Sequence, residues 1–152
     1  MDEILGITPG EEDEVVWEKL VTIETNIDDM SPQVLAYVCE ELMAGGALDA
    51  WVTPAVMKKG RPGWVLGTLC RPGEERRLMR VVLSETTSLG VRVAECSRAA
   101  LHRDFRPATT PWGDVSVKVG YLGGVEVNAH PEYEDCAALA RAHGVPLKDV
   151  MA

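Results

Sequence analysis

Residues 21–46 read VTIETNIDDMSPQVLAYVCEELMAGG, and local signals within them set the order of the first elements. The β-branched, apolar stretch 15–25 predicts a strand. Ser31 followed by Pro32 is typical of a helix start, because the serine side chain accepts a backbone hydrogen bond and proline has no N–H to leave unpaired. Apolar residues then recur at helical spacing as far as Leu42, and Gly45-Gly46 predicts the end of the helix.

Similar signals continue along the chain. Strands are predicted over 48–57, 64–70 and 90–100, a turn over 58–63, and a second helix over 74–85. The resulting order, β-α-β-β-α-β, is that of a ferredoxin-like sandwich, so the predicted fold class is α+β. The remainder adds short strands around Phe105, at 115–119 and at 125–127, and a C-terminal helix over 131–143. We expect a flexible acidic linker or tail over 1–14 and a single domain over 15–152.

Composition narrows the class of protein. The 152 residues carry a net charge of −9, which argues against nucleic-acid binding. No apolar run reaches the roughly 18 residues of a membrane span, so a soluble protein without a membrane partner is expected. The four cysteines form no C-x-x-C pair and lie in apolar segments. They are expected to be small buried side chains in a reducing, cytoplasmic compartment.

The predicted topology brings three polar loops together. A crossover helix makes the first two strands parallel, so both end on the same side of the sheet. The third strand returns and the second helix climbs back to that side. The loops 25–31, 58–63 and 86–92 should therefore share one end of the sheet, although the three lie far apart in the sequence.

The first loop offers oxygen ligands. Asn26, Asp28 and Asp29 precede a helix N-terminus, and hard divalent ions such as Mn²⁺ or Mg²⁺ prefer such ligands. The alternative is that these side chains only cap a turn, which is the favoured interpretation for this loop taken alone.

The other two loops offer groups that bind phosphate. The candidate nucleotide-binding residues are Lys58, Lys59, Arg61, Thr86, Thr87 and Arg92. Cations around a glycine turn and loop hydroxyls can hold phosphate oxygens; the alternatives are a solvated hairpin tip and plain helix C-capping. Together the loops predict a site for a metal–nucleoside triphosphate. The chain has no Walker A sequence, and no residue is assigned as the catalytic group.

Four of these segments also carry a family resemblance. Glu24-Thr-Asn-Ile-Asp-Asp29, Gly46-Ala-Leu-Asp49 with Met57-Lys-Lys-Gly-Arg-Pro62, Thr86-Thr-Ser-Leu-Gly-Val-Arg92 and Pro131-Glu-Tyr-Glu-Asp135 occur in this order. The chain resembles, over residues 17 to 150, the nickel-insertion proteins that make the nickel-pincer nucleotide cofactor of lactate racemase.

The resemblance implies an activity. Members of that family insert nickel, as a substrate, into pyridinium-3,5-bisthiocarboxylic acid mononucleotide and consume CTP with manganese. Their C-terminal part is ferredoxin-like, binds CTP and forms oligomers. They also carry a long N-terminal region that this chain lacks, so we expect residues 1–14 to be the end of a linker and the isolated chain to be incomplete for catalysis.

A second class of function stays open. Ferredoxin-like domains often serve as non-catalytic regulatory or oligomerisation modules that bind a small anionic ligand. In either case we expect a homo-oligomer, built on a trimer, such as a hexamer. Titration with CTP, with and without manganese, separates the two classes.

Overall fold

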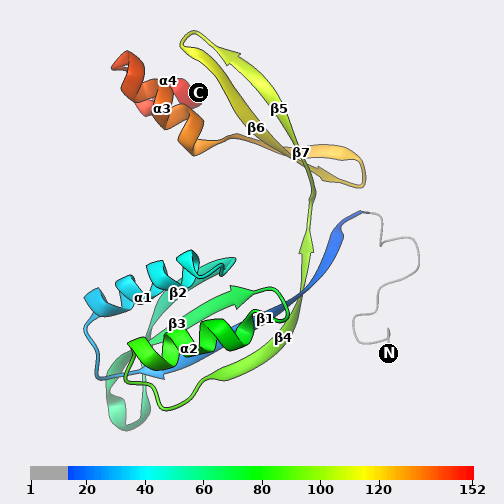
Figure 1. Ribbon diagram of the computed structural model, residues 1–152. Coiled ribbons are helices and arrows are strands. Elements are labelled where there is room, and N and C mark those ends of the chain that lie inside the picture. The colour runs from blue at the N-terminus through cyan, green and yellow to red at the C-terminus, as the bar shows by residue number, and fades with distance from the viewer. Residues whose placement is uncertain (1–13) are drawn as a thin grey trace. The chain divides into compact units, whose positions relative to one another are not determined.

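A computed structural model describes residues 14–152, so the expected flexible tail at 1–13 lies outside the described residues. The described chain divides into two compact units, and the predicted domain over 15–152 spans both of them. We call residues 18–98 the ferredoxin-like unit and residues 14–17 with 99–152 the C-terminal unit. Figure 1 labels their elements. Two separate hydrophobic clusters, one in each unit, are the physical reason for the division.

The ferredoxin-like unit has the predicted element order. Its elements are β1 (Val16–Ile27), α1 (Pro32–Ala44), β2 (Asp49–Val56), a 3-10 turn (Lys58–Gly60), β3 (Pro62–Cys70), α2 (Glu75–Glu85) and β4 (Arg92–Ala100). The strand order is β2-β3-β1-β4, and β3 pairs antiparallel with both β1 and β2. The α+β class and the β-α-β-β-α-β order are therefore confirmed.

Helix α1 begins and ends at the predicted signals. Ser31 is the N-cap and its side chain accepts from the Gln33 N–H at 3.2 Å, while Pro32 occupies the first turn. Gly45 caps the other end, with its N–H donating to Glu41 O at 2.8 Å. The next residue, Gly46, has a φ of 95°, a conformation that glycine adopts without a Cβ clash.

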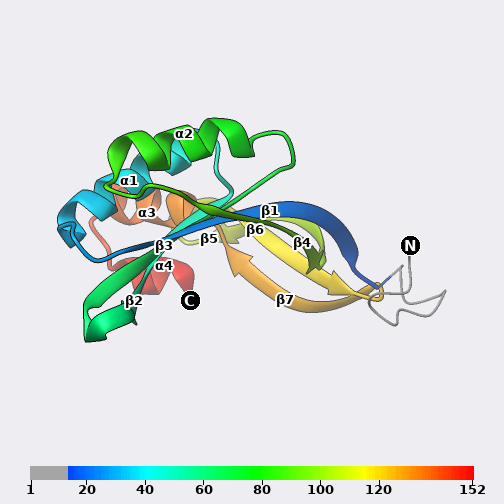
Figure 2. The same cartoon turned by 90° about the horizontal axis from the view of Figure 1, so that it is seen from below.

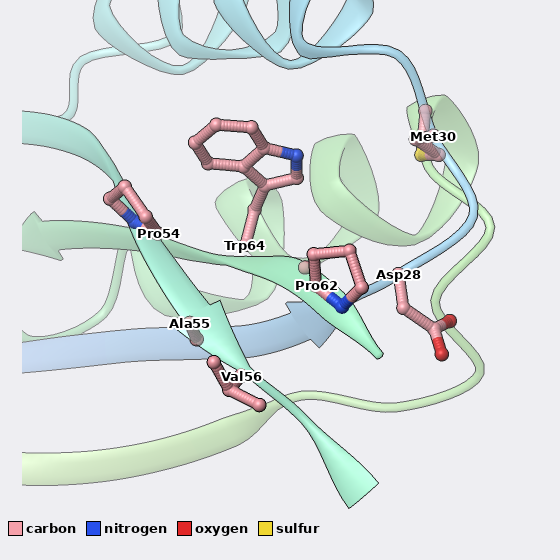
Figure 3. A pocket seen from close by; sticks show the side chains of 8 residues that line it. Asp28, Met30, Pro54, Ala55, Val56, Pro62 and Trp64 are labelled. Carbon is pink, nitrogen blue, oxygen red and sulfur yellow. The ribbon is translucent and has the colours of Figure 1, made fainter. Parts of the chain in front are cut away.

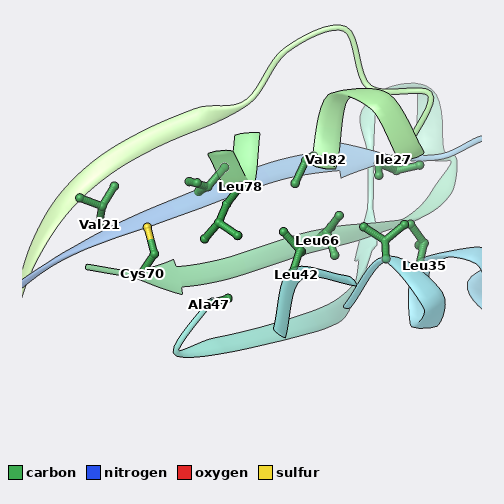
Figure 4. Close-up of a cluster of buried hydrophobic side chains, with 11 residues drawn as sticks. Val21, Ile27, Leu35, Leu42, Ala47, Leu66, Cys70, Leu78 and Val82 are labelled. Atoms are coloured by element: carbon green, nitrogen blue, oxygen red, sulfur yellow. The ribbon is translucent and has the colours of Figure 1, made fainter. Parts of the chain in front are cut away.

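Both helices cover one face of the sheet (Figures 1 and 2). Figure 4 shows the core between the helices and the sheet. It combines apolar residues of β1 and β3 with one apolar face of each helix. Its largest fully buried members are Ile23, Ile27, Leu35, Val38, Leu42, Leu66, Leu78 and Val82. Each such side chain contributes about 1.5–3 kcal/mol by leaving water, so this core holds the loop ends of the strands in place.

The C-terminal unit contains the additional elements. The strands β5 (His102–Thr110), β6 (Gly113–Leu122) and β7 (Val125–Pro131) form an antiparallel sheet in that order. Helix α3 (Tyr133–His143) ends at Gly144, as predicted, and a short α4 (Leu147–Met151) was not anticipated. The core here joins Val115 of β6 to Cys136, Ala140 and Val150. Among the described residues, no helix combines the length and hydrophobicity needed to cross a membrane.

Candidate functional site

Side-chain contacts join the three polar loops at one end of the ferredoxin-like sheet. Asp29 Oδ1 accepts a hydrogen bond from Thr87 Oγ1 at 2.5 Å, which links the loop after β1 to the loop after α2. Asp28 Oδ2 lies 3.6 Å from Arg61 Nη1, which links the first loop to the β2–β3 turn. The expected meeting of these loops is therefore confirmed.

Thr25 adds a buried link between the first and third loops. Its side chain is only 3% exposed, and its hydroxyl donates to Gly90 O at 3.0 Å and contacts the Ser88 hydroxyl. Ser88 Oγ also donates to Gly90 O, at 2.7 Å. Because a buried hydroxyl without a partner is costly, these bonds fix the 86–91 segment against β1. The role of both hydroxyls here is to position the loop.

Asn26 is placed differently from the sequence expectation. Strand β1 extends to Ile27, which pairs with Trp64, so Asn26 belongs to the strand rather than to the loop. Its Oδ1 accepts from Arg92 Nη2 at 2.7 Å, and Arg92 also lies 3.6 Å from Glu24 Oε2. The amide oxygen of Asn26 and the guanidinium of Arg92 thus satisfy each other, on a strand pair beside the loops.

Thr86 and Thr87 have separate roles. Thr86 Oγ1 donates to Val82 O at 2.7 Å and accepts from the Ser88 N–H at 3.2 Å, so it caps the end of α2. That is the alternative that the sequence left open for this loop. Thr87 is exposed and its hydroxyl points to Asp29.

The β2–β3 turn presents cations on a strained backbone. Lys59 adopts φ 63° and ψ 21°, and Gly60 follows at φ 70°. The turn is closed by the Met57 N–H donating to Arg61 O at 2.7 Å. A lysine in the left-handed region costs roughly 1–2 kcal/mol. Within residues 14–152 neither Lys58 nor Lys59 forms an ion pair, so both exposed ammonium groups are available to a ligand.

A pocket of about 530 Å³ opens beside this junction. Figure 3 shows it between the ends of β2 and β3 and the segment that leads into α1. Its lining is mostly apolar, with Asp28 as the charged member: Asp28, Met30, Pro54, Ala55, Val56, Pro62, Gly63 and Trp64. This apolar wall was not predicted from the sequence, where its only signal is the run of apolar residues on both sides of the cationic turn.

Gly63 keeps that pocket open and the hairpin close to β1. A Cβ at this position would lie 2.4 Å from Met57 Sδ and 2.7 Å from Ile27 O. Real Cβ atoms do not approach backbone oxygen so closely, so only glycine permits this contact.

The arrangement is that of an oxygen-ligand cluster facing exposed cations. Asp28 and Asp29 supply carboxylates and Thr87 a hydroxyl, while Lys58, Lys59 and Arg61 supply positive charge. No group of three or more His, Cys, Asp or Glu side chains gathers in the described part of the chain. A hard cation here therefore needs oxygens from a bound anion to complete its shell, as Mg²⁺-type ions commonly do with phosphates.

Comparison with known proteins shows the family of this chain. The family model described as nickel insertion protein matches residues 1–151 of the chain. The chain belongs to the nickel insertion protein family. This confirms the family resemblance drawn from the four sequence motifs.

Individual relatives of the family are also similar. A Myxococcus xanthus protein named "Putative nickel insertion protein" is 49% identical over 149 residues, covering 98% of this chain and 38% of that protein. The "Pyridinium-3,5-bisthiocarboxylic acid mononucleotide nickel insertion protein" of Clostridium acetobutylicum is 42% identical over 148 residues, covering 97% of this chain and 35% of that protein. The chain thus spans little more than a third of the length of these relatives.

A solved structure shares the fold of this family member. It is the apo form of the C-terminal domain of a cyclometallase involved in the synthesis of the NPN cofactor of lactate racemase. The two agree with a TM-score of 0.82 and 38% sequence identity, over 89% of this chain and 93% of that chain. The α+β architecture is therefore one that a nickel-insertion protein uses as its C-terminal part.

Proposed function

We propose that this chain is the CTP- and manganese-binding part of an enzyme that inserts nickel into pyridinium-3,5-bisthiocarboxylic acid mononucleotide. Family membership supports the nickel-insertion role, and the names of the similar proteins support the mononucleotide substrate and the cofactor product. The observation that carries the nucleotide part is the junction of Asp28 with Arg61 and Asp29 with Thr87 beside an apolar pocket.

In this proposal the CTP triphosphate lies at the cationic turn. Lys58, Lys59 and Arg61 hold phosphate oxygens by charge-assisted hydrogen bonds, which are about twice as strong as neutral ones. The base packs against Trp64 and Pro54, because a flat heterocycle gains dispersion and hydrophobic energy from such a wall.

Manganese is held by Asp28 and Asp29 in this proposal, and the donor set fits such an ion. Two neighbouring carboxylates and a hydroxyl are hard oxygen ligands of the kind that Mn²⁺ accepts. When bound, the metal neutralises charge on the phosphate oxygens. Asn26 and Arg92 lie next to this set and already pair with each other. We therefore assign them to positioning the β1–β4 end of the site, and Thr86 to capping α2.

The assembly and location belong to the same proposal. We infer a homo-oligomer built on a trimer, such as a hexamer, from the resemblance to an oligomeric family. Large apolar side chains that remain uncovered in the single chain support an oligomer of some kind. Leu89 is 103% exposed and Val56 is 82% exposed. Light scattering that returns the mass of one 16.5 kDa chain at micromolar concentration would contradict this inference. A cytoplasmic location fits the four free cysteines.

Calorimetric titration tests the proposal. The 152-residue chain is titrated with CTP and with ATP, each with and without Mn²⁺. We expect tighter CTP binding with the metal, because a divalent cation would offset the repulsion between the carboxylates of Asp28 and Asp29 and the phosphates. Lys58→Gln and Arg61→Gln should weaken binding by about tenfold with or without metal. The matched control is Arg71→Gln, an exposed arginine just beyond the far end of β3.

One result would favour the other class of function. If CTP binds equally with and without Mn²⁺, or does not bind, the loops are solvated turns of a regulatory or oligomerisation module. Nickel insertion by this chain alone is not expected, because the relatives are almost three times longer.

A further inference from the structure

A second hollow lies on the C-terminal unit and takes no part in the proposed CTP site. It encloses about 260 Å³ and is lined by Leu101, Arg103, Lys118, Gly120, Asn128 and His130. Strand register explains why these residues meet. Gly120 is opposite both Arg103 and Asn128, and Lys118 is opposite His130, so their side chains share one face of the β5-β6-β7 sheet. Val115 and Val117 of β6 serve the core with α3 instead.

The lining is rich in hydrogen-bond donors and contains no carboxylate. Arg103 contributes a guanidinium, Lys118 an ammonium, Asn128 an amide and His130 an imidazole. In the part of the chain that the structure describes, Arg103 has no ion pair, whereas Arg106 on the same strand is neutralised by two 2.8 Å bonds to Glu126. Lys118 Nζ lies 2.8 Å from Glu132 Oε1, which uses one of its three protons and holds the ammonium in place.

Two further features shape what the hollow accepts. Gly120 leaves room at its floor, since a Cβ there would approach Leu101 Cδ1 to 2.8 Å. Phe105 lies beside one of the lining residues, Lys118: the two residues pair in register, the ring centroid is 5.6 Å from Lys118 Nζ, and Phe105 is 55% exposed. An exposed aromatic ring beside a group of cations suits a flat heterocycle that carries a phosphate.

We propose that this hollow binds the phosphate monoester of a mononucleotide. The phosphate oxygens accept hydrogen bonds from Arg103, Lys118 and Asn128, and the heterocycle packs against Phe105. Arginine suits the role because its planar donors match two phosphate oxygens at once. The volume suits a phosphate and part of its sugar, with the heterocycle outside. The assignment rests on the C-terminal unit alone and does not depend on the proposed CTP site.

Nuclear magnetic resonance titration of the full chain tests this site. The probes are inorganic phosphate and nicotinic acid mononucleotide, and the readout is the backbone amide shifts of Gly120, Asn128 and His130. We expect both probes to move these three signals, and the mononucleotide to bind more tightly than phosphate. Phe105→Ala should remove that difference in affinity, because it removes the ring that contacts the heterocycle.

Variants separate the site from general charge effects. Arg103→Gln and Lys118→Gln should each weaken mononucleotide binding by about tenfold, while Arg141→Gln, an exposed arginine of α3, should not. Gly120→Ala should also weaken binding although it changes no charge. Unchanged affinity in Arg103→Gln, no shifts up to about 10 mM probe, or shifts confined to residues 57–63 would overturn the proposal. None of these outcomes depends on whether CTP binds with manganese.

Discussion

Replacing Asp28 with Asn should separate the binding role of this carboxylate from any role in stability. The side chain keeps its shape but loses its charge, its ion pair with Arg61 and its capacity as a metal ligand. Asp28 Oδ2 and Arg61 Nη1 are 3.6 Å apart, a separation worth about 1.2 kcal/mol in water and about 4.6 kcal/mol at an effective dielectric constant of 20.

Exposure decides which of these two values applies. The Arg61 side chain is 62% exposed and that of Asp28 is 22% exposed, so water screens the pair. Exposed pairs measured by double-mutant cycles contribute about 0.2–1 kcal/mol. We therefore expect Asp28→Asn to lower the free energy of unfolding by less than about 1 kcal/mol, measured by urea denaturation with circular dichroism.

Ligand binding should respond much more strongly. In Asp28→Asn the increase in CTP affinity caused by Mn²⁺ should fall by about tenfold or more, because a charged ligand of the ion is lost. CTP binding without metal should be unchanged or slightly tighter. The matched control is Asp114→Asn, an exposed aspartate of β6. A loss of stability above about 2 kcal/mol, or an unchanged effect of Mn²⁺ on CTP affinity, would refute the assignment. Asp28 would then only cap the turn.

Three predictions concern the fold that supports the site. Lys59→Val should destabilise the protein by about 1–2 kcal/mol more than Lys58→Val, because a β-branched side chain resists φ 63°; equal effects in thermal melts would contradict this. Leu66→Ala should lower the free energy of unfolding by about 2–5 kcal/mol in urea denaturation, because Leu66 is 1% exposed; a loss below about 1 kcal/mol would contradict this. Burial raises the pKa of the Cys70 thiol above its ordinary 9.0. As pH rises, this thiol therefore ionises in the unfolded chain before it ionises in the folded chain. The stability that the protonated, buried thiol contributes is complete below about pH 9 and is lost as pH rises above it. Urea titrations at pH 7 and pH 10 should show this loss, and it should be smaller in Cys70→Ala.

Local chemistry was enough to predict most of the fold. The helix signals at Ser31 and Gly45 are short-range, and the alternation of apolar residues in the strands reports the buried face directly. The rule for crossover connections then placed the three loops at one end. What local chemistry did not indicate was the division into two units. Strands β1 and β4 run through the boundary near residues 17 and 98, and no glycine- or proline-rich linker marks it.

The sequence predicted which loops form the site, but not which side chains pair with one another there. Asn26 was grouped with Asp28 and Asp29 because it precedes them by a few residues. In the structure β1 continues to Ile27, so Asn26 joins Arg92 instead. Such pairings depend on where a strand stops and on side-chain rotamers, and neither is encoded by residue spacing. The apolar residues that line the pocket around Trp64 were not predicted as part of a site. The sequence of an apolar strand end is the same whether other residues cover it in the structure or leave it exposed.

The ion pair and the hydrogen bond at the proposed site indicate how it would accept a metal–triphosphate at little cost. Asp28 holds Arg61 and Asp29 holds Thr87, so the carboxylates and one cation of the site partly satisfy each other. A metal–triphosphate brings both signs of charge at once. The ion can take the carboxylates while the phosphates take Arg61 and the two lysines, so each group exchanges one partner for another. Free triphosphate would instead face two carboxylates unshielded, and free metal would leave the cationic turn unpaired. This exchange is the physical reason to expect metal and nucleotide to bind together more tightly than either binds alone.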